Sequence, residues 1–124
     1  MNLLNKEIVK TYIVENKNTA YKVGSGGLLV LATPEIIRFV ENIAFNMVQE
    51  ELIEEETTVG GYIDINHLKP TLVGKTIQIS VILKEICSKK LVFEYIAYEG
   101  NSKIATGKHE RCIVNKEKFM TKAK

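Results

Sequence analysis

The sequence lacks the features that would identify several large classes of protein. Two cysteines in 124 residues are too few for a disulfide framework or a cysteine-rich metal site, so we expect free thiols at Cys87 and Cys112. No apolar run approaches the roughly 20 residues of a membrane span, and the start of the chain has no basic stretch followed by an apolar one. We therefore expect a soluble, cytoplasmic protein.

Charge of one sign is also scarce. Lysine and arginine number 17 against 15 aspartates and glutamates, a net charge of +2, so we expect neither a nucleic-acid partner nor a membrane partner. Lysines do gather near the end of the chain, at Lys116, Lys118, Lys122 and Lys124. We interpret this segment as a solvated, partly frayed tail rather than an anion site.

The chain is predicted to form one domain, residues 1–124, because its length fits a single core and no repeat, linker or low-complexity segment divides it. A helical pattern covers about residues 33–51. Strands are predicted at 4–14, 58–68, 75–86, 90–99 and 102–114. One amphipathic helix followed by a meander of long strands predicts an α+β domain in which an antiparallel sheet wraps the helix.

The predicted helix has a marked start and one apolar face. Thr33 is a good N-cap because its hydroxyl can accept from an unpaired amide, and Pro34 suits the first helical position because no amide is needed there. Apolar residues then recur at three-and-four spacing from Ile36 to Val48. The preceding glycine-rich segment, 23–27, lacks the Gly-Lys-Ser/Thr ending of a phosphate-binding loop, so we interpret it as a flexible flap.

Two polar residues fall on faces that these patterns assign to the interior. Glu41 lies on the shoulder of the helix's apolar stripe, where a glutamate often snorkels outward or pairs with a lysine. His67 shares the strand parity of Ile63 and Ile65 and so points toward the helix, although a lone histidine there is often only structural. Together the two residues would form an acid–base pair with tunable pKa values.

Three further positions are candidates for the same site. Thr33 would place a hydroxyl at the positive end of the helix, although capping competes for the same oxygen. Gly60 and Gly61 interrupt a strand and indicate a bulge, or a place where a ligand meets backbone amides. Arg111 would position a phosphate or carboxylate, or else form a salt bridge at the rim. His109 shares the parity of Arg111, and its role stays open.

These residues belong to an ordered pattern along most of the chain. It runs Gly24-Ser25-Gly26, Leu31-Ala32-Thr33-Pro34, Glu41, Gly60, His67-Leu68-Lys69-Pro70-Thr71, Gly74 and Gly107-Lys108-His109-Glu110-Arg111. The order and spacing resemble the fluoroacetyl-CoA thioesterase-like branch of the hot-dog-fold thioesterases, from about residue 20 to Phe119. The resemblance implies a hot-dog fold, a homodimer that pairs its sheets edge to edge, and active sites near the dimer interface.

The resemblance also implies roles for the candidate residues. Thr33, Glu41 and His67 match the family's catalytic threonine, glutamate and histidine, while Gly60 and Arg111 match its supporting glycine and arginine. The implied reaction is hydrolysis of an acyl-CoA thioester without a cofactor or a metal ion. Glu41 would attack directly or activate water, His67 would orient the glutamate or exchange the proton with the departing thiol, and Thr33 would bond to the acyl group.

The segment before the helix bears on the substrate. The family's specialist enzyme for fluoroacetyl-CoA carries a longer, aromatic-bearing lid there, whereas residues 23–31 are short, glycine-rich and free of phenylalanine. We therefore predict a small or medium acyl-CoA as substrate. Two alternatives fit the same fold, namely a non-catalytic acyl-CoA-binding protein and an enoyl-CoA hydratase or dehydratase, which also uses a histidine with a carboxylate.

Overall fold

The computed structural model describes residues 2–124, and its organising element is the helix α2 (Thr33–Gln49). One side of this helix carries most of the predicted apolar stripe, except that Ile37, which we expected in the stripe, is partly exposed, and Phe39 is buried in addition. The rest of the chain covers the stripe, whose buried members are Ile36, Phe39, Val40, Ile43, Ala44, Met47 and Val48. This burial stabilises α2, because a single amphipathic helix is only marginally stable in water.

The stripe packs against an antiparallel sheet with the spatial order β1-β4-β5-β6-β2. The strands in that order are β1 (Glu7–Ile13), β4 (Thr76–Cys87), β5 (Lys90–Glu99), β6 (Ser102–Asn115) and β2 (Glu56–Ile63). Their period-two patterns place the predicted residues inside, at Ile77, Ile79, Val81 and Leu83 of β4 and at Leu91, Phe93, Tyr95 and Ala97 of β5.

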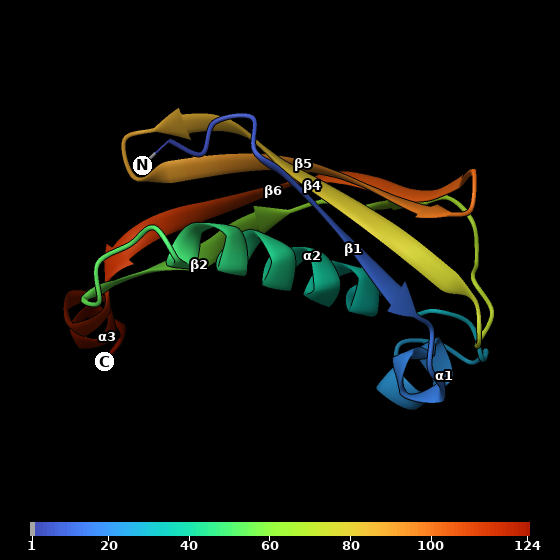
Figure 1. Ribbon diagram of the computed structural model, residues 1–124. Coiled ribbons are helices and arrows are strands. Elements are labelled where there is room, and N and C mark those ends of the chain that lie inside the picture. Colours follow the sequence, from blue (N-terminus) through green and yellow to red (C-terminus); the bar gives the residue numbers. More distant parts are fainter. Residues whose placement is uncertain (1) are drawn as a thin grey trace.

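Figure 1 shows how these layers are arranged. The sheet curls over α2 on one side, and the short helices α1 and α3 lie at opposite ends of the molecule. The fold is therefore α+β with the hot-dog arrangement, a long antiparallel sheet wrapped around one central helix, and the predicted fold class is confirmed.

The edge of the sheet nearest the candidate residues differs from the prediction. The expected strand over 58–68 is two strands, β2 and β3 (Asn66–His67), and both pair with β6. The register of β2 shifts between Gly60 and Tyr62, which is the bulge that the paired glycines indicated. The two strands are separated at Asp64, which bonds across to the backbone of β6. Within residues 2–124, β2 has no neighbour on its outer side.

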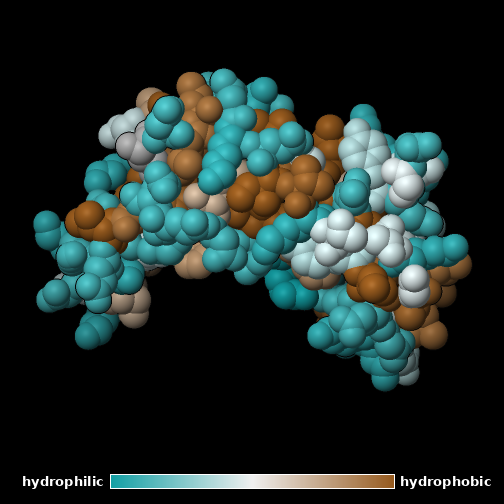
Figure 2. All heavy atoms as spheres, in the orientation of Figure 1, coloured by the Kyte–Doolittle hydropathy of each residue, from teal (hydrophilic) through white to brown (hydrophobic). Residues whose placement is uncertain are grey.

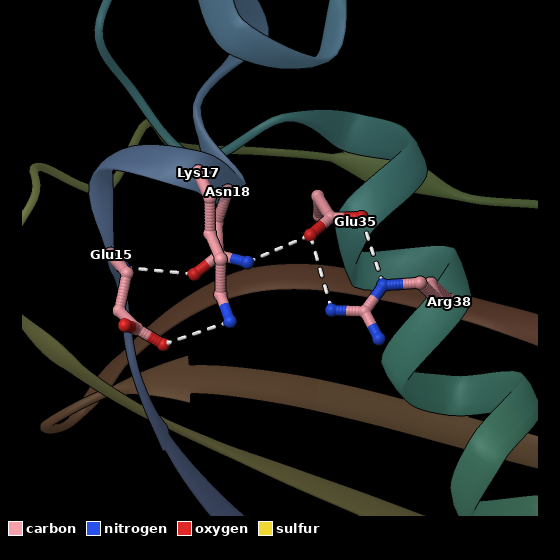
Figure 3. A network of polar contacts seen from close by, with 5 residues as sticks. All are labelled: Glu15, Lys17, Asn18, Glu35 and Arg38. Atoms are coloured by element: carbon pink, nitrogen blue, oxygen red, sulfur yellow. Dashed lines mark hydrogen bonds and ion pairs between the residues drawn. The ribbon is translucent and has the colours of Figure 1, made fainter.

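A polar network anchors the start of α2 (Figure 3). The short helix η1 (Asn16–Asn18) ends in a side chain that is only 2% exposed. Asn18 Nδ2 donates to Glu35 Oε1 at 2.7 Å, and Glu15 N donates to Asn18 Oδ1 at 2.8 Å. Glu35 also accepts from Arg38 Nε at 3.0 Å. The first turn of α2 is thereby held against the N-terminal segment.

Short helices lie next to the predicted flap and within the basic tail that we predicted to be frayed. The flap is preceded by the helical turn α1 (Ala20–Val23), and Ala20 N donates to Val30 O at 2.8 Å, which closes the loop at its ends. The basic tail forms α3 (Lys116–Ala123), and the side chain of Asn115 caps it by accepting an amide at 2.9 Å. The prediction of a frayed tail was wrong over this range, because a good N-cap satisfies the first turn locally.

The face in Figure 2 is largely polar, and its apolar side chains form several separate patches, one of them at the α1 end of the molecule. Exposed apolar residues of this end are Tyr21, Leu28, Leu29 and Leu72. Both cysteines are free thiols, as predicted. In the part of the chain that the structure describes, no helix has the length and apolar character to span a bilayer.

Candidate active site

One flank of α2 carries both of the site residues predicted on this helix, Thr33 and Glu41. Thr33, Ile37, Glu41 and Phe45 follow one another at four-residue spacing, so they lie above one another on the helix surface. All four are partly exposed, unlike the buried stripe beside them. The line borders the edge of the sheet that β2 and β3 form, because its first and third members contact residues of those strands.

Thr33 does not cap α2, contrary to the prediction. The N-cap is Ala32, which makes no side-chain hydrogen bond, and Thr33 is already the first helical residue. Few backbone amides at this end of the helix need a cap, because Pro34 has no amide hydrogen and Glu35 N donates to Ala32 O at 3.0 Å. The Thr33 hydroxyl instead lies 2.7 Å from Nδ1 of His67.

His67 has the inward orientation that its strand parity predicted. Ile63 and Ile65, which share that parity, pack against the core. The Nε2 atom of His67 is buried and has no hydrogen-bond partner among residues 2–124. Burial lowers the pKa of His67 below its ordinary value of 6.5, and the nearby backbone of Lys69 opposes this. The imidazole is therefore neutral at neutral pH and able to accept a proton.

Glu41 faces the bulged part of β2. A Cβ atom at Gly60 would lie 3.1 Å from Glu41 Oε2 and 3.5 Å from Arg111 Nη1, so glycine keeps the space before the carboxylate open. No hydrogen bond or ion pair holds the carboxylate within residues 2–124, and the expected alternative of a lysine partner does not occur there. A pocket of about 260 Å³ is bordered by Glu41, Gly60, Gly61, Tyr62, Ile63 and His109.

Arg111 approaches the same space from β6. It is only 7% exposed and forms no ion pair with the described residues, so the alternative of a rim salt bridge is wrong. Its Nε donates to Thr58 Oγ1 at 2.8 Å, and its Nη2 donates to Thr58 O at 3.1 Å. Burial lowers the pKa of Arg111, and the nearby charge of Glu41 opposes this. The guanidinium remains charged, because its pKa starts far above neutral pH.

The structure thus forms two polar groups rather than one. Thr33 and His67 make the first group, and Glu41, Gly60 and Arg111 make the second. Thr33 and Glu41 are separated by about 12 Å along α2, at a rise of roughly 1.5 Å per residue, with Ile37 between them. In the described part of the chain no hydrogen bond joins Glu41 to His67, so the expected direct acid–base pair is not formed within one chain.

His109 belongs to the second group, although the sequence left its role open. It is 1% exposed and lies two residues before Arg111 on the same face of β6. Its Nδ1 atom is 2.8 Å from Tyr62 O, and its Nε2 atom is 3.2 Å from Arg111 Nη1. The signal that could have found it is its shared parity with Arg111 on a strand predicted to be buried.

Comparison with known proteins finds one family over most of this architecture. The family model described as fluoroacetyl-CoA-specific thioesterase matches residues 14–117. A fluoroacetyl-CoA thioesterase of Streptantibioticus cattleyicolor is 26% identical over 95 residues, which cover 77% of this chain and 68% of that protein.

Solved structures show the same fold at lower sequence identity. The fluoroacetyl-CoA thioesterase FlK aligns with a TM-score of 0.90 and 21% identity, over 97% of this chain and 93% of that chain. A hot-dog-like protein from Thermanaerovibrio acidaminovorans aligns with a TM-score of 0.90 and 17% identity, over 97% and 89%. A thioesterase superfamily member from Thermus thermophilus aligns with a TM-score of 0.86 and 22% identity, over 95% and 88%.

Proposed function

Because the chain belongs to the fluoroacetyl-CoA-specific thioesterase family, we propose that it hydrolyses small or medium acyl-CoA thioesters at a site that contains Thr33, Glu41 and His67. Membership in this family makes the chain a thioester hydrolase. The geometry of the two polar groups supports the finer assignment of residues and of acyl length.

The observation that supports this assignment most directly is the free carboxylate of Glu41, which faces Gly60 and the buried guanidinium of Arg111. A thioester carbonyl placed in the adjoining pocket would meet an oxygen base on one side. The positive charge of Arg111 and the amides of the β2 bulge would stabilise the oxyanion that forms as the carbonyl is attacked. Gly60 and Arg111 would therefore bind substrate rather than react with it.

The first polar group, Thr33 and His67, would transfer the proton. When the carbon–sulfur bond breaks, the CoA thiolate leaves and takes up a proton, and the acyl group departs as a carboxylate after water has added to the carbonyl. A neutral His67 would exchange that proton, while Thr33 would hold the imidazole and bond to the acyl group. The apolar turn between the groups, at Ile37, would contact a short hydrocarbon chain.

A homodimer would complete the surroundings of the site. Among the residues that the structure describes, nothing pairs with the outer edge of β2, and such an edge is a template for a strand of a second copy. Pairing there would cover the pocket beside Glu41. Sedimentation should show a dimer, and specific activity should fall on dilution as the dimer dissociates. A monomer with full activity at all concentrations would contradict this part of the proposal.

The test of function is a panel of acyl-CoA esters assayed for release of free thiol. The wild type should hydrolyse short and medium chains, and both Glu41→Gln and His67→Ala should lower kcat/KM by on the order of 100-fold or more. Glu51→Gln, which changes an exposed carboxylate just beyond the same helix, is the matched control and should behave as wild type. Activity that survives both site substitutions would overturn the assignment.

The same assay separates the alternative functions. Loss of the ultraviolet absorbance of an enoyl-CoA without thiol release would identify a hydratase. Tight binding of acyl-CoA without any turnover would identify a binding protein. Neither result is compatible with the hydrolytic site proposed for Glu41.

The two routes open to Glu41 differ in where the oxygen of water goes. Direct attack would form a mixed anhydride, and under single turnover in ¹⁸O-labelled water part of the label would enter the Glu41 carboxylate. Activation of water would place the label only in the released acid. Mass spectrometry of the peptide that contains Glu41 distinguishes the two.

A further inference from the structure

His109 is the most deeply buried ionisable side chain beside the site, and the chemistry proposed above does not use it. It is 1% exposed, and its ring stacks at 5.8 Å on Phe93 in the core. Both ring nitrogens have defined neighbours, namely the Tyr62 carbonyl oxygen at 2.8 Å and Arg111 Nη1 at 3.2 Å. These neighbours determine which of the two ring nitrogens carries the proton.

The contacts of His109 are compatible with only one protonation state. A guanidinium nitrogen can only donate, so Nε2 of His109 must accept from Arg111 Nη1. A carbonyl oxygen can only accept, so Nδ1 must carry the proton that bonds to Tyr62 O. The ring is therefore the neutral Nδ1–H form, and a second proton would leave Arg111 facing another cation.

Arg111 is held on several sides as a result. Thr58 accepts from both Nε and Nη2, at 2.8 and 3.1 Å, and His109 accepts from Nη1. The guanidinium carbon also lies 5.8 Å from the centre of the Phe45 ring of α2. With these contacts the planar group cannot rotate, and its Nη1 edge faces Gly60 and the carboxylate of Glu41.

We propose that His109 is a positioning residue that stays uncharged and holds Arg111 Nη1 beside the carboxylate of Glu41. This inference rests on the proposed function, since Glu41 is the reacting group there. It adds that the position of the charged Arg111 depends on a histidine that accepts a hydrogen bond from it and does not exchange a proton. His109 would then contribute nothing to the pH profile of catalysis between about pH 5 and about pH 8.

The surroundings of the ring favour the neutral state. The charged groups that face it are Arg111 and Glu110 of its own strand and Glu41 of α2. Burial lowers the pKa of His109 most, and Arg111 lowers it further, while the Tyr62 carbonyl and the charges of Glu41 and Glu110 oppose this. The geometry alone leads to the same state, because protonation would remove the acceptor that Arg111 Nη1 has among residues 2–124.

Two substitutions of similar size separate the two hydrogen bonds. In His109→Gln the side-chain oxygen reaches the position of Nε2 and can still accept from Arg111, whereas His109→Asn keeps a donor near Tyr62 O but is too short to reach Arg111. We expect His109→Gln to retain kcat/KM within about fivefold of wild type. His109→Asn should lower kcat on the order of 100-fold with little change in KM, because a small displacement of a charged group is that costly.

A second pair of substitutions tests the same proposal at Thr58, the other hydrogen-bond partner of Arg111. Thr58→Val removes the acceptor for Nε without a change of shape, and Thr58→Ser keeps it. Thr58→Val should lower kcat and Thr58→Ser should not. Thermal unfolding of all four variants identifies any that fail to fold, so the proposal stays testable if one pair is lost.

A measurement without turnover keeps this inference apart from the proposed function. The ¹⁵N NMR signals of the His109 ring should show a protonated Nδ1 and an unprotonated Nε2, unchanged from about pH 5 to about pH 8. Titration of His109 in that range, or equal losses of kcat in His109→Gln and His109→Asn, would overturn the inference. An unchanged ring with no thiol release by the wild type would instead refute the proposed function alone.

Discussion

The hydroxyl of Thr33 lies 2.7 Å from Nδ1 of His67, and this contact joins the first residue of the central helix to the short strand β3. It links two positions 34 residues apart. Because Ala32 takes the N-cap position, the threonine oxygen is available to the histidine rather than to the helix. A residue that looks like a structural cap in sequence is thus part of a polar site.

The first prediction concerns this hydroxyl. Thr33→Val keeps the shape and removes the hydrogen bond, which leaves both ring nitrogens of His67 without a partner among the described residues. We expect a loss of about 1 kcal/mol of stability, measured by urea unfolding. We also expect kcat/KM to fall by about 10-fold or more. Thr33→Ser is the control, and a valine variant as active as the serine variant would exclude a role for the hydroxyl.

The second prediction concerns the space beside Glu41. In Gly60→Ala the new Cβ would lie 3.1 Å from Glu41 Oε2, so the carboxylate must shift by a few tenths of an ångström, whereas the distances of 3.5 Å to Arg111 Nη1 and His109 Cε1 are ordinary contacts. Activity toward acyl-CoA should fall on the order of 100-fold while the fold persists. Gly61→Ala is the matched control, since a Cβ there meets nothing within 4 Å. Equal effects of the two substitutions would show that Gly60 only shapes the strand.

The third prediction concerns acid stability. Burial lowers the pKa of both His67 and His109 below the ordinary 6.5, so the unfolded chain binds more protons than the folded chain as the pH falls past that value. The stability that the neutral rings contribute is present above about pH 6.5 and decreases below it. Urea unfolding at a series of pH values should show this, and His67→Gln should flatten the slope. As the pH falls, the decrease in stability should begin at a higher pH than the titration of Glu35, because bonding to Arg38 lowers the pKa of that carboxyl below its ordinary 4.5.

The fourth prediction concerns the core beside β3. In Gly107→Ala the new Cβ would lie 2.5 Å from the Tyr95 hydroxyl and closer still to the Asp64 carbonyl oxygen, which accepts from that hydroxyl. The overlap involves backbone that cannot move freely, so stability should fall by about 3 kcal/mol. Gly27→Ala, where a Cβ meets nothing within 4 Å, should cost far less in the same thermal unfolding experiment.

The fifth prediction concerns the network of Figure 3. Asn18→Ala removes the bond to Glu35 and the bond from Glu15 N, and it leaves the Glu15 amide unpaired. Stability should fall by about 2 kcal/mol. Lys17→Ala, whose side chain is 73% exposed, is the control and should stay within about 0.5 kcal/mol of wild type. If both variants unfold at the same urea concentration, the network does not anchor α2.

The sequence by itself determined the faces of the long elements. Apolar spacing identified the buried stripe of α2 and the inner residues of β4 and β5, because helix and strand periodicity are properties of neighbouring residues. The same local rule placed Glu41 on the flank of the helix and His67 on the inner side of its strand. The hot-dog arrangement was accessible because one amphipathic helix and a meander of strands allow few ways to bury both faces.

Only the tertiary structure decided which polar atoms meet. The partner of Thr33 lies 34 residues away, and the contact between Arg111 and Thr58 spans 53 residues. Those contacts depend on the register between β2 and β6 and on the bulge beside Gly60. A shift of one residue would turn His109 and Arg111 to the opposite face. Local spacing carries no information on that register, because the packing of the whole sheet over α2 sets it. For this reason the sequence predicted Glu41 and His67 as one pair, whereas in the structure they belong to two groups.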